Sequence, residues 1–337
     1  MKMMENSKRS FRKIALVATF VLAGYTLLWE SPNDIKGRRA VSVTDDQYKQ
    51  NVGNLSDPLK KRDTPLYWHI PKSSGSSMKV YYGCMGLTLV TQSGTTAGHE
   101  HDKTLQVWER TAPGGATFKF VNVDTSIMQG IFRAKKIGLA ESGLADVVFS
   151  PFPPIATAMF TPSHQARFFA LFRHPIERAV SLFYYHQVAT WERNDYTYRP
   201  ELVGMTIEEW LTKSSTAAEM KNPYMRSLLH KQRFNDDDLE KAKDILRTKF
   251  LVGLTTKMEE SVDRFDKYFG WYDNAKRSQC QRRTIQDGIN KNPHAALKEG
   301  SKEWNMLAEM NKYDMQLYEF IVQLYEEQGE LFLNRDD

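Results

Sequence analysis

The sequence predicts an α/β fold with a central, mainly parallel sheet flanked by helices. Short apolar runs typical of buried strands alternate with segments typical of helices, as expected for strands joined by helical crossovers. The composition agrees, because 41% of the 337 residues are hydrophobic and 26% are charged, as in an ordinary globular protein. The length suits one large domain or two smaller ones, and no internal repeat is visible.

The predicted strands are short and rich in branched and aromatic residues. They lie at 66–70, 118–123, 147–149, 167–172 and 250–253. Helices are predicted from near Ser76, over 125–138 with Thr125 as a candidate N-cap, from Pro175, over 258–269, and over 301–328 as one long or broken helix. The polar, basic stretch 274–291 predicts a mobile loop, whose Lys276, Arg277, Arg282 and Arg283 either are solvated or contact an anionic glycan.

The N-terminus has the pattern of a membrane signal anchor. Basic residues within 1–13 precede an uncharged apolar run over 14–29, slightly shorter than the roughly 20 residues that span an average bilayer. The positive flank predicts a cytosolic tail over 1–13, a transmembrane helix over 14–29 and a lumenal C-terminal bulk. A cleaved signal peptide is the competing interpretation.

Residues 30–64 are predicted to form a polar stem, because they carry no apolar period and bury too little surface to fold alone. The stem contains the sequon Asn54-Leu55-Ser56, which in a lumen would be open to glycosylation. The folded domain is predicted over 65–330. Its two cysteines, Cys84 and Cys280, allow at most one internal disulfide, and the sequence leaves open whether they pair or stay as buried thiols.

The segment 68–78, Trp-His-Ile-Pro-Lys-Ser-Ser-Gly-Ser-Ser-Met, is the first candidate site. A buried strand leads into a turn of small residues and then a helix, whose first N–H groups favour a phosphate. Lys72 adds a positive charge, and Ser76 and Ser77 add hydroxyl donors. The order argues against an ordinary nucleotide triphosphatase, because Lys72 precedes Gly75 instead of following a glycine.

The segment 168–184, Phe-Phe-Ala-Leu-Phe-Arg-His-Pro-Ile-Glu-Arg-Ala-Val-Ser-Leu-Phe-Tyr, is the second candidate site. Arg173 follows a buried strand at the edge where ligands gather in open α/β sheets. Arg178 and Ser181 share a face of the next helix. An arginine fork and a hydroxyl suit a terminal phosphate, although Arg178 also fits a surface arginine paired with a carboxylate.

Both segments resemble motifs of sulfotransferases that use 3′-phosphoadenosine 5′-phosphosulfate (PAPS). The first is similar to their 5′-phosphosulfate loop, most of all to carbohydrate enzymes of the heparan-sulfate 2-O/6-O type, which read His-Ile-Pro-Lys-Thr-Gly-Gly-Thr; this chain has one glycine fewer. The second is similar to their 3′-phosphate motif, Arg-Asp/His-Pro-x-x-Arg-x-x-Ser-x-x-Tyr. Weaker likeness at 250–261 and 313–318 extends the resemblance over about residues 66–328.

The resemblance implies a P-loop-like three-layer fold and transfer of a sulfuryl group from PAPS to a hydroxyl, most simply of a carbohydrate, in the Golgi lumen. It implies no metal, and the mild net charge of +5 suits anionic nucleotides without arguing for nucleic acid. PAPS would be held by two sets of residues, carried over from the two motifs. They are Lys72, Ser73, Ser74, Gly75, Ser76 and Ser77 for the 5′ end, and Arg173, Arg178 and Ser181 for the 3′-phosphate.

Lys72 would also be catalytic, by steadying charge on the bridging oxygen. For the general base that accepts the hydroxyl proton, the sequence leaves several candidates. The histidine that some relatives carry just before the second motif is missing from 148–152. His99 and His101 are the candidates, with Glu100 as a further possibility and a solvated loop as the alternative. His186 is expected to be a packing or acceptor-contact residue.

Two other functions stay open from the sequence. A P-loop kinase would require ATP and magnesium, and the lysine-first loop speaks against it. The other is a non-catalytic lumenal binding module, which would have the same fold but no catalytic base.

Overall fold

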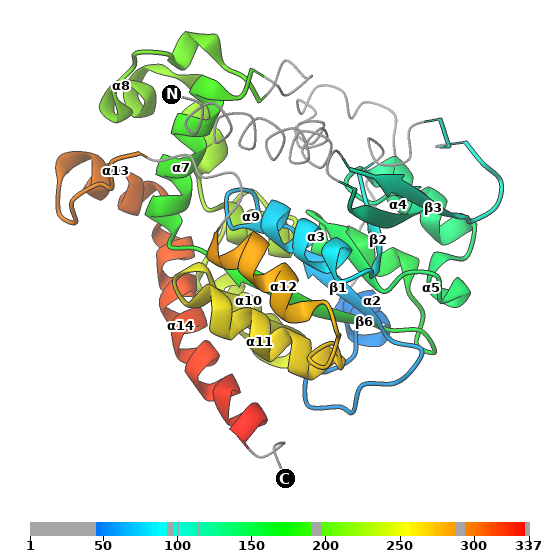
Figure 1. Cartoon of the computed structure of the whole chain (residues 1–337). Helices are drawn as coiled ribbons and strands as arrows, with labels where there is room; N and C mark the ends of the chain where they lie inside the picture. Colours follow the sequence, from blue (N-terminus) through cyan, green and yellow to red (C-terminus); the bar gives the residue numbers. More distant parts are fainter. Residues whose placement is uncertain are drawn as a thin grey trace, which may run out of the picture.

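A computed structural model describes residues 45–92, 98–99, 101–112, 115–190, 197–287 and 294–333. Over these ranges the chain forms a seven-stranded sheet in the order β3-β4-β2-β5-β1-β6-β7. Every pairing is parallel except that of β3 with β4. The predicted α/β fold with a mostly parallel sheet flanked by helices is therefore confirmed (Figure 1). The strands are β1 Thr64–Trp68, β2 Thr88–Thr91, β3 Val107–Thr111, β4 Thr117–Asp124, β5 Val147–Ser150, β6 Ala166–Phe172 and β7 Phe250–Leu254.

The helices cover both faces of the sheet and one end of it (Figure 1). Those of the N-terminal half are α2 Asp45–Asn51, α3 Gly75–Cys84, α4 Met128–Lys136, α5 Leu139–Ser142, α6 Pro153–Ala156 and α7 Pro175–Val188. Those of the C-terminal half are α8 Ile207–Lys213, α9 Pro223–Leu229, α10 Asp236–Lys249, α11 Met258–Phe269, α12 Arg277–Gln281, α13 Lys302–Met310 and α14 Lys312–Leu333. Short 3-10 and π turns connect several of them, including η2 Thr157–Met159, η4 Ser215–Met220 and η6 Arg282–Gln286.

Strand alternation separates two hydrophobic cores. Leu66 and Trp68 of β1 face a core that includes residues of α4, α9, α10 and α14. Tyr67, between them, faces a second core with α3, α11 and α12. This period of two follows from the pleat of a strand. A third core, around Trp210, joins α7, α8 and α13 beyond the sheet.

The second half of the expected stem is part of the folded unit. Val52 is fully buried and forms a parallel bridge with Ala166, the first residue of β6. Arg167, 2% exposed, pairs with Asp63 (Nε to Oδ2, 2.7 Å) and donates to main-chain carbonyls of 54–58. A buried ion pair and backbone hydrogen bonds hold this segment. Because neither requires apolar residues at regular spacing, the sequence carries no sign that the segment is folded.

The predicted cytosolic tail, the anchor over 14–29 and the start of the stem lie outside the described residues, which begin at Asp45. Within the described ranges, no helix has both the length and the apolar character needed to cross a membrane.

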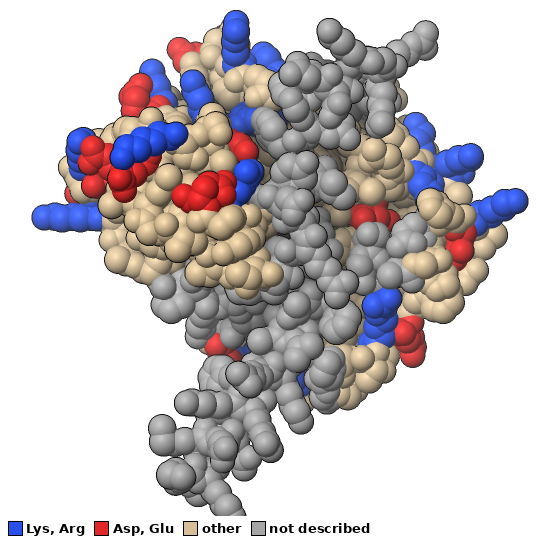
Figure 2. All heavy atoms as spheres, turned by 90° about the horizontal axis from the view of Figure 1, so that it is seen from above, with Lys and Arg blue, Asp and Glu red and all other residues tan. Residues whose placement is uncertain are grey.

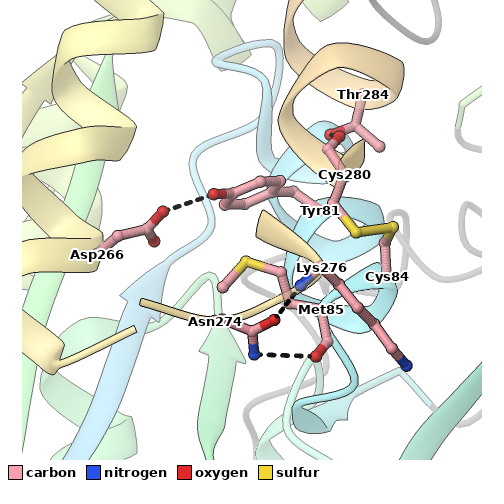
Figure 3. The surroundings of a disulfide bond; sticks show 8 residues. All are labelled: Tyr81, Cys84, Met85, Asp266, Asn274, Lys276, Cys280 and Thr284. Carbon is pink, nitrogen blue, oxygen red and sulfur yellow. Dashed lines mark hydrogen bonds between the residues drawn. A yellow bond between two sulfur atoms is a disulfide. The ribbon is translucent and has the colours of Figure 1, made fainter. Parts of the chain in front are cut away.

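A disulfide joins Cys84, at the end of α3, to Cys280 in α12, with their Cα atoms 5.7 Å apart (Figure 3). Asn274, just before α12, donates to the carbonyl of Met85 at the end of α3 (3.2 Å). The Tyr81 hydroxyl of α3 donates to Asp266 of α11 (2.5 Å), so α3 is tied to both helices. The described part of 274–291 is therefore helical and anchored, and the prediction of a mobile loop is wrong for 274–287.

Arg277 does not belong to an open basic cluster. Its guanidinium is bound to Asp263 and Asp266, and the residue is only 8% exposed. Because both carboxylates bind it, Arg277 is not the solvated arginine of an open loop. Its charge instead fastens α12 to α11.

Candidate functional site

The loop between β1 and α3 has the backbone of an anion-binding turn. Lys72 and Ser74 lie in the left-handed region (φ 65° and 63°), and Ser73 between them has negative φ. Alternating signs of φ turn successive N–H groups toward one side, which makes a concavity for an anion. Ser74 is the N-cap of α3 and makes no side-chain cap, and the first turn of the helix carries no acidic residue. The first N–H groups of α3 thus add positive potential at the loop.

Gly75 is the one position in this loop that excludes a side chain. A Cβ placed there would lie 2.2 Å from Nε2 of His69, which is buried at 3% exposure. The single glycine therefore lets the loop close over the histidine ring. Burial, and to a lesser degree the charge of Lys79, holds the pKa of His69 well below its usual value.

The two segments singled out from the sequence meet in the structure. β1 and β6 are neighbours in the sheet, with Tyr67 opposite Phe169, so the loops that follow them lie side by side. Arg173 donates through Nη1 to the carbonyl of Lys72 at 3.4 Å, across 101 residues of chain. The Arg173 side chain keeps 26% of its surface exposed and also contacts Glu177 (Nε to Oε2, 3.4 Å).

Helix α7 begins two residues after Arg173 and carries Tyr185 to Lys72. The Lys72 ammonium lies 3.8 Å from the centre of the Tyr185 ring, a favourable position for a cation over an aromatic face. Ser181, 4% exposed, is one turn before Tyr185 and therefore on the same face of the helix. Lys72 and Arg173 thus meet at the carboxyl ends of β1 and β6, with the helix face that carries Ser181 and Tyr185 beside them.

Arg178 is not a surface arginine, so that interpretation of it is wrong. The residue is 2% exposed. Its guanidinium lies 5.8 Å from the centre of the Tyr224 ring, and Nη2 lies 3.8 Å from the sulfur of Met220. Nε has no hydrogen-bond partner among the described residues. Burial lowers the pKa of Arg178, and the charge of Asp314 partly offsets this.

Tyr224 was missed in the sequence and supports Arg173 directly. Its hydroxyl accepts from the Arg173 N–H (3.3 Å) and donates to the Arg173 carbonyl. The main chain at Tyr224 is fixed in turn, because Asp314 accepts from the N–H groups of Tyr224 (2.8 Å) and Met225 (2.9 Å). Asn222 reciprocates by accepting from the N–H groups at the start of α14. These contacts give a physical role to 313–318, a segment noted in the sequence only for its likeness to other proteins.

Asp314 is fully buried, and burial raises its pKa to about 7, against the opposing effect of the two N–H donors. The carboxyl group is a second structural link between α14 and α9.

Replacing Tyr224 with phenylalanine should weaken binding of a ligand at Arg173. The change removes both hydrogen bonds to the Arg173 main chain and keeps the ring, so Arg173 loses its fixed orientation. We expect a loss of about 1–3 kcal/mol in affinity, measured by calorimetry with adenosine 3′,5′-bisphosphate. Tyr48→Phe is the matched control, because the buried Tyr48 ring packs on Phe168 and its hydroxyl has no hydrogen-bond partner among the described residues. An affinity equal to that of the unchanged protein would contradict a positioning role for Tyr224.

The structure does not bring the predicted base candidates to Lys72. His99 stacks on Trp108 of β3 (ring centres 3.7 Å apart), and its Nδ1 lies 3.0 Å from Asp102. β3 is the edge strand, four positions from β1, or roughly 19 Å at the usual strand spacing. His101 is exposed on the same loop, and Glu100 lies outside the described residues.

The surface near α8 mixes both signs of charge. Seen from above, Lys and Arg side chains lie beside Asp and Glu over this part of the molecule (Figure 2). Lys213 pairs with Glu209 (2.9 Å), and Lys302 of α13 pairs with Glu208 (2.6 Å). Over the described ranges, no group of three or more His, Cys, Asp and Glu side chains is placed to hold a metal ion.

Lys72 and Arg173 are the basic residues that the loops after β1 and β6 bring into contact. Comparison of the chain with models of known protein families found no match, and comparison with curated proteins found none.

Proposed function

We propose that this protein is a PAPS-dependent sulfotransferase. The observation that carries the proposal is the contact of Arg173 with the carbonyl of Lys72 at 3.4 Å. A loop suited to a 5′-phosphosulfate and an arginine suited to a 3′-phosphate lie together, as one nucleotide phosphorylated at both ends requires. The left-handed turn at Lys72 and Ser74 and the uncapped start of α3 support the first half of this assignment.

In this proposal the sheet is the centre of a P-loop-like three-layer fold, and each site residue has one role. The N–H groups and hydroxyls of 73–77 hold the 5′-phosphosulfate. Arg173 and Ser181 hold the 3′-phosphate, and the buried Arg178 adds positive potential beneath it. An acceptor hydroxyl attacks sulfur in line, and adenosine 3′,5′-bisphosphate leaves while Lys72 stabilises charge on the bridging oxygen. The proposed acceptor is a carbohydrate hydroxyl, and the reaction needs no metal.

The proposed location is the lumen of the Golgi, with the chain anchored through residues 14–29. The disulfide Cys84–Cys280 supports an oxidising compartment, because such bonds persist in the secretory route and are rare in the cytosol. Asn54 is exposed within its sequon, which suits glycosylation in the same compartment.

Calorimetry with adenosine 3′,5′-bisphosphate in the presence of a chelator tests the proposal. We expect binding without magnesium, and much weaker binding of adenosine 5′-monophosphate, which lacks the 3′-phosphate for Arg173 and Ser181. Arg173→Ala should remove most of the difference between the two nucleotides. If the bisphosphate fails to bind, or if ATP with magnesium binds more tightly, the protein is not a sulfotransferase.

A further inference from the structure

The last turn of α7 lies beside the catalytic end of the candidate site. Tyr185 on this turn packs against the Lys72 ammonium at 3.8 Å, and Ser181 of the same helix face is one turn earlier. Lys72 would contact the bridging oxygen of PAPS, and its charge also acts on His186. His186 is the residue after Tyr185, and 7% of its surface is exposed.

The hydrogen bonding of His186 fixes which ring nitrogen is basic. Its Nδ1 lies 2.6 Å from the main-chain carbonyl oxygen of Thr197. A carbonyl oxygen only accepts, so the proton of the neutral ring is on Nδ1 and the lone pair is on Nε2. A main-chain partner that sets the tautomer and holds the ring orientation is the arrangement a general base requires.

Burial, together with nearby positive charge, lowers the pKa of His186 and favours the neutral ring. Burial lowers its pKa below the usual 6.5, the hydrogen bond to Thr197 opposes this, and the charges of Arg199 and Lys72 lower it further. Glu201 acts in the opposite direction. Arg199 is itself paired with Glu219 (3.5 Å) and lies 3.9 Å from Glu201. The ring is thus unprotonated on Nε2 and available to accept a proton.

The other described histidines of the predicted site are placed less well. His99 is stacked on Trp108 at the far edge of the sheet. His69 is covered by Gly75 inside the loop.

We propose that His186 is the general base of the sulfuryl transfer, an inference that rests on the function proposed above. Nε2 takes the proton from the acceptor hydroxyl as its oxygen forms a bond to sulfur. The bond between sulfur and the bridging oxygen breaks, and its electron pair leaves with adenosine 3′,5′-bisphosphate. The proton on the imidazolium then passes to water, which restores the neutral ring.

His186→Asn tests the proposal most sharply. The asparagine amide N–H occupies nearly the place of Nδ1–H and keeps the bond to Thr197, while the basic Nε2 is lost. We expect release of adenosine 3′,5′-bisphosphate from PAPS to fall by about 10²–10⁴-fold, with chemically desulfated heparin as acceptor and also with water alone. Calorimetry should show unchanged affinity for the bisphosphate, which demonstrates that the variant is folded.

The pH profile separates catalysis from a structural role. A base works only when unprotonated, so the rate of the unchanged protein should decline as the pH falls through the pKa of His186, which lies below 6.5. His186→Asn should lack this decline, and His186→Gln, which also has no basic nitrogen, should lack it too. A side chain that only packed would leave the profile unaltered.

His99→Asn is the matched control and should keep the rate of the unchanged protein. Full turnover in His186→Asn, or the loss appearing in His99→Asn instead, would overturn the assignment while leaving the sulfotransferase proposal intact. Failure of the unchanged protein to bind adenosine 3′,5′-bisphosphate would overturn the function itself. A protein that binds the bisphosphate but releases none from PAPS, with either acceptor, would contradict both proposals.

Discussion

Replacing Lys72 with alanine is expected to lower the rate of sulfuryl transfer by about 10²–10³-fold. The ammonium group lies where the loops after β1 and β6 meet, against the Tyr185 ring. There it would meet negative charge that grows on the bridging oxygen only as the bond to sulfur breaks. Its loss therefore raises the barrier of the chemical step more than it weakens binding of the donor.

Single-turnover measurements with PAPS, beside calorimetry with adenosine 3′,5′-bisphosphate, separate these two effects. Lys61→Ala is the matched control, because Lys61 is exposed in the turn before β1, at the opposite end of that strand from Lys72. A Lys72→Ala protein with the rate of the Lys61→Ala protein would remove Lys72 from the mechanism. Equal losses in rate and in affinity would make it a binding residue alone.

Removing the disulfide should cost about 2–5 kcal/mol in the free energy of unfolding. The bond closes a segment of 196 residues, and long closed segments restrict the unfolded chain most in the chain-entropy account. The double change Cys84→Ala and Cys280→Ala avoids leaving a buried lone thiol or hydroxyl, since Cys280 is 1% exposed. Urea unfolding followed by circular dichroism gives the difference.

Addition of a reductant supplies the control for this measurement. It should shift the midpoint of the unchanged protein toward that of the double variant and leave the variant where it is. Equal midpoints for the two oxidised proteins would show that Cys84 and Cys280 do not pair in solution. That result would also remove one support for a lumenal location.

Much of the sheet could be predicted because its buried strands are locally apolar. β1, β5, β6 and β7 are buried along nearly their whole length, and β4 mostly so. β2 was missed because Thr88–Thr91 is only four residues long, bounded by threonines. β3 was missed because it is an edge strand whose residues are alternately exposed and half-buried, without a continuous apolar signal.

The helix boundaries show where local rules were overridden. Thr125 does not cap α4; its hydroxyl donates to the carbonyl of Phe149 (2.7 Å), and Ile127 occupies the N-cap position. A contact with a strand that is distant in the sequence was stronger than the local preference. The predicted helix over 301–328 is broken at Asn311, which is fully buried and donates its side-chain amide to Leu307.

That the loops after β1 and β6 lie together was foreseeable, because ligand sites in parallel sheets gather at the carboxyl ends of neighbouring strands. The hydrogen bonds that hold the main chain of Arg173 were not foreseeable. Tyr224 and Asp314 come from helices 51 and 141 residues further along the chain than Arg173, and no local pattern relates them to it. The same holds for the burial of Arg178, which depends on Met220 and Tyr224 packing over it.

The contacts of Arg167 fix residues 54–63 at one end of the sheet. Residues 52–63 are bound at the amino ends of β1, β6 and β7, through the bridge of Val52 to Ala166 and the hydrogen bond from Lys249 to the Val52 carbonyl. Lys72 and Arg173 occupy the carboxyl ends of the same strands. The described start of the chain therefore joins the sheet at the end opposite the proposed nucleotide site. If the protein is anchored through its N-terminus as proposed, a bulky polymeric acceptor would reach that site from the side opposite residues 52–63.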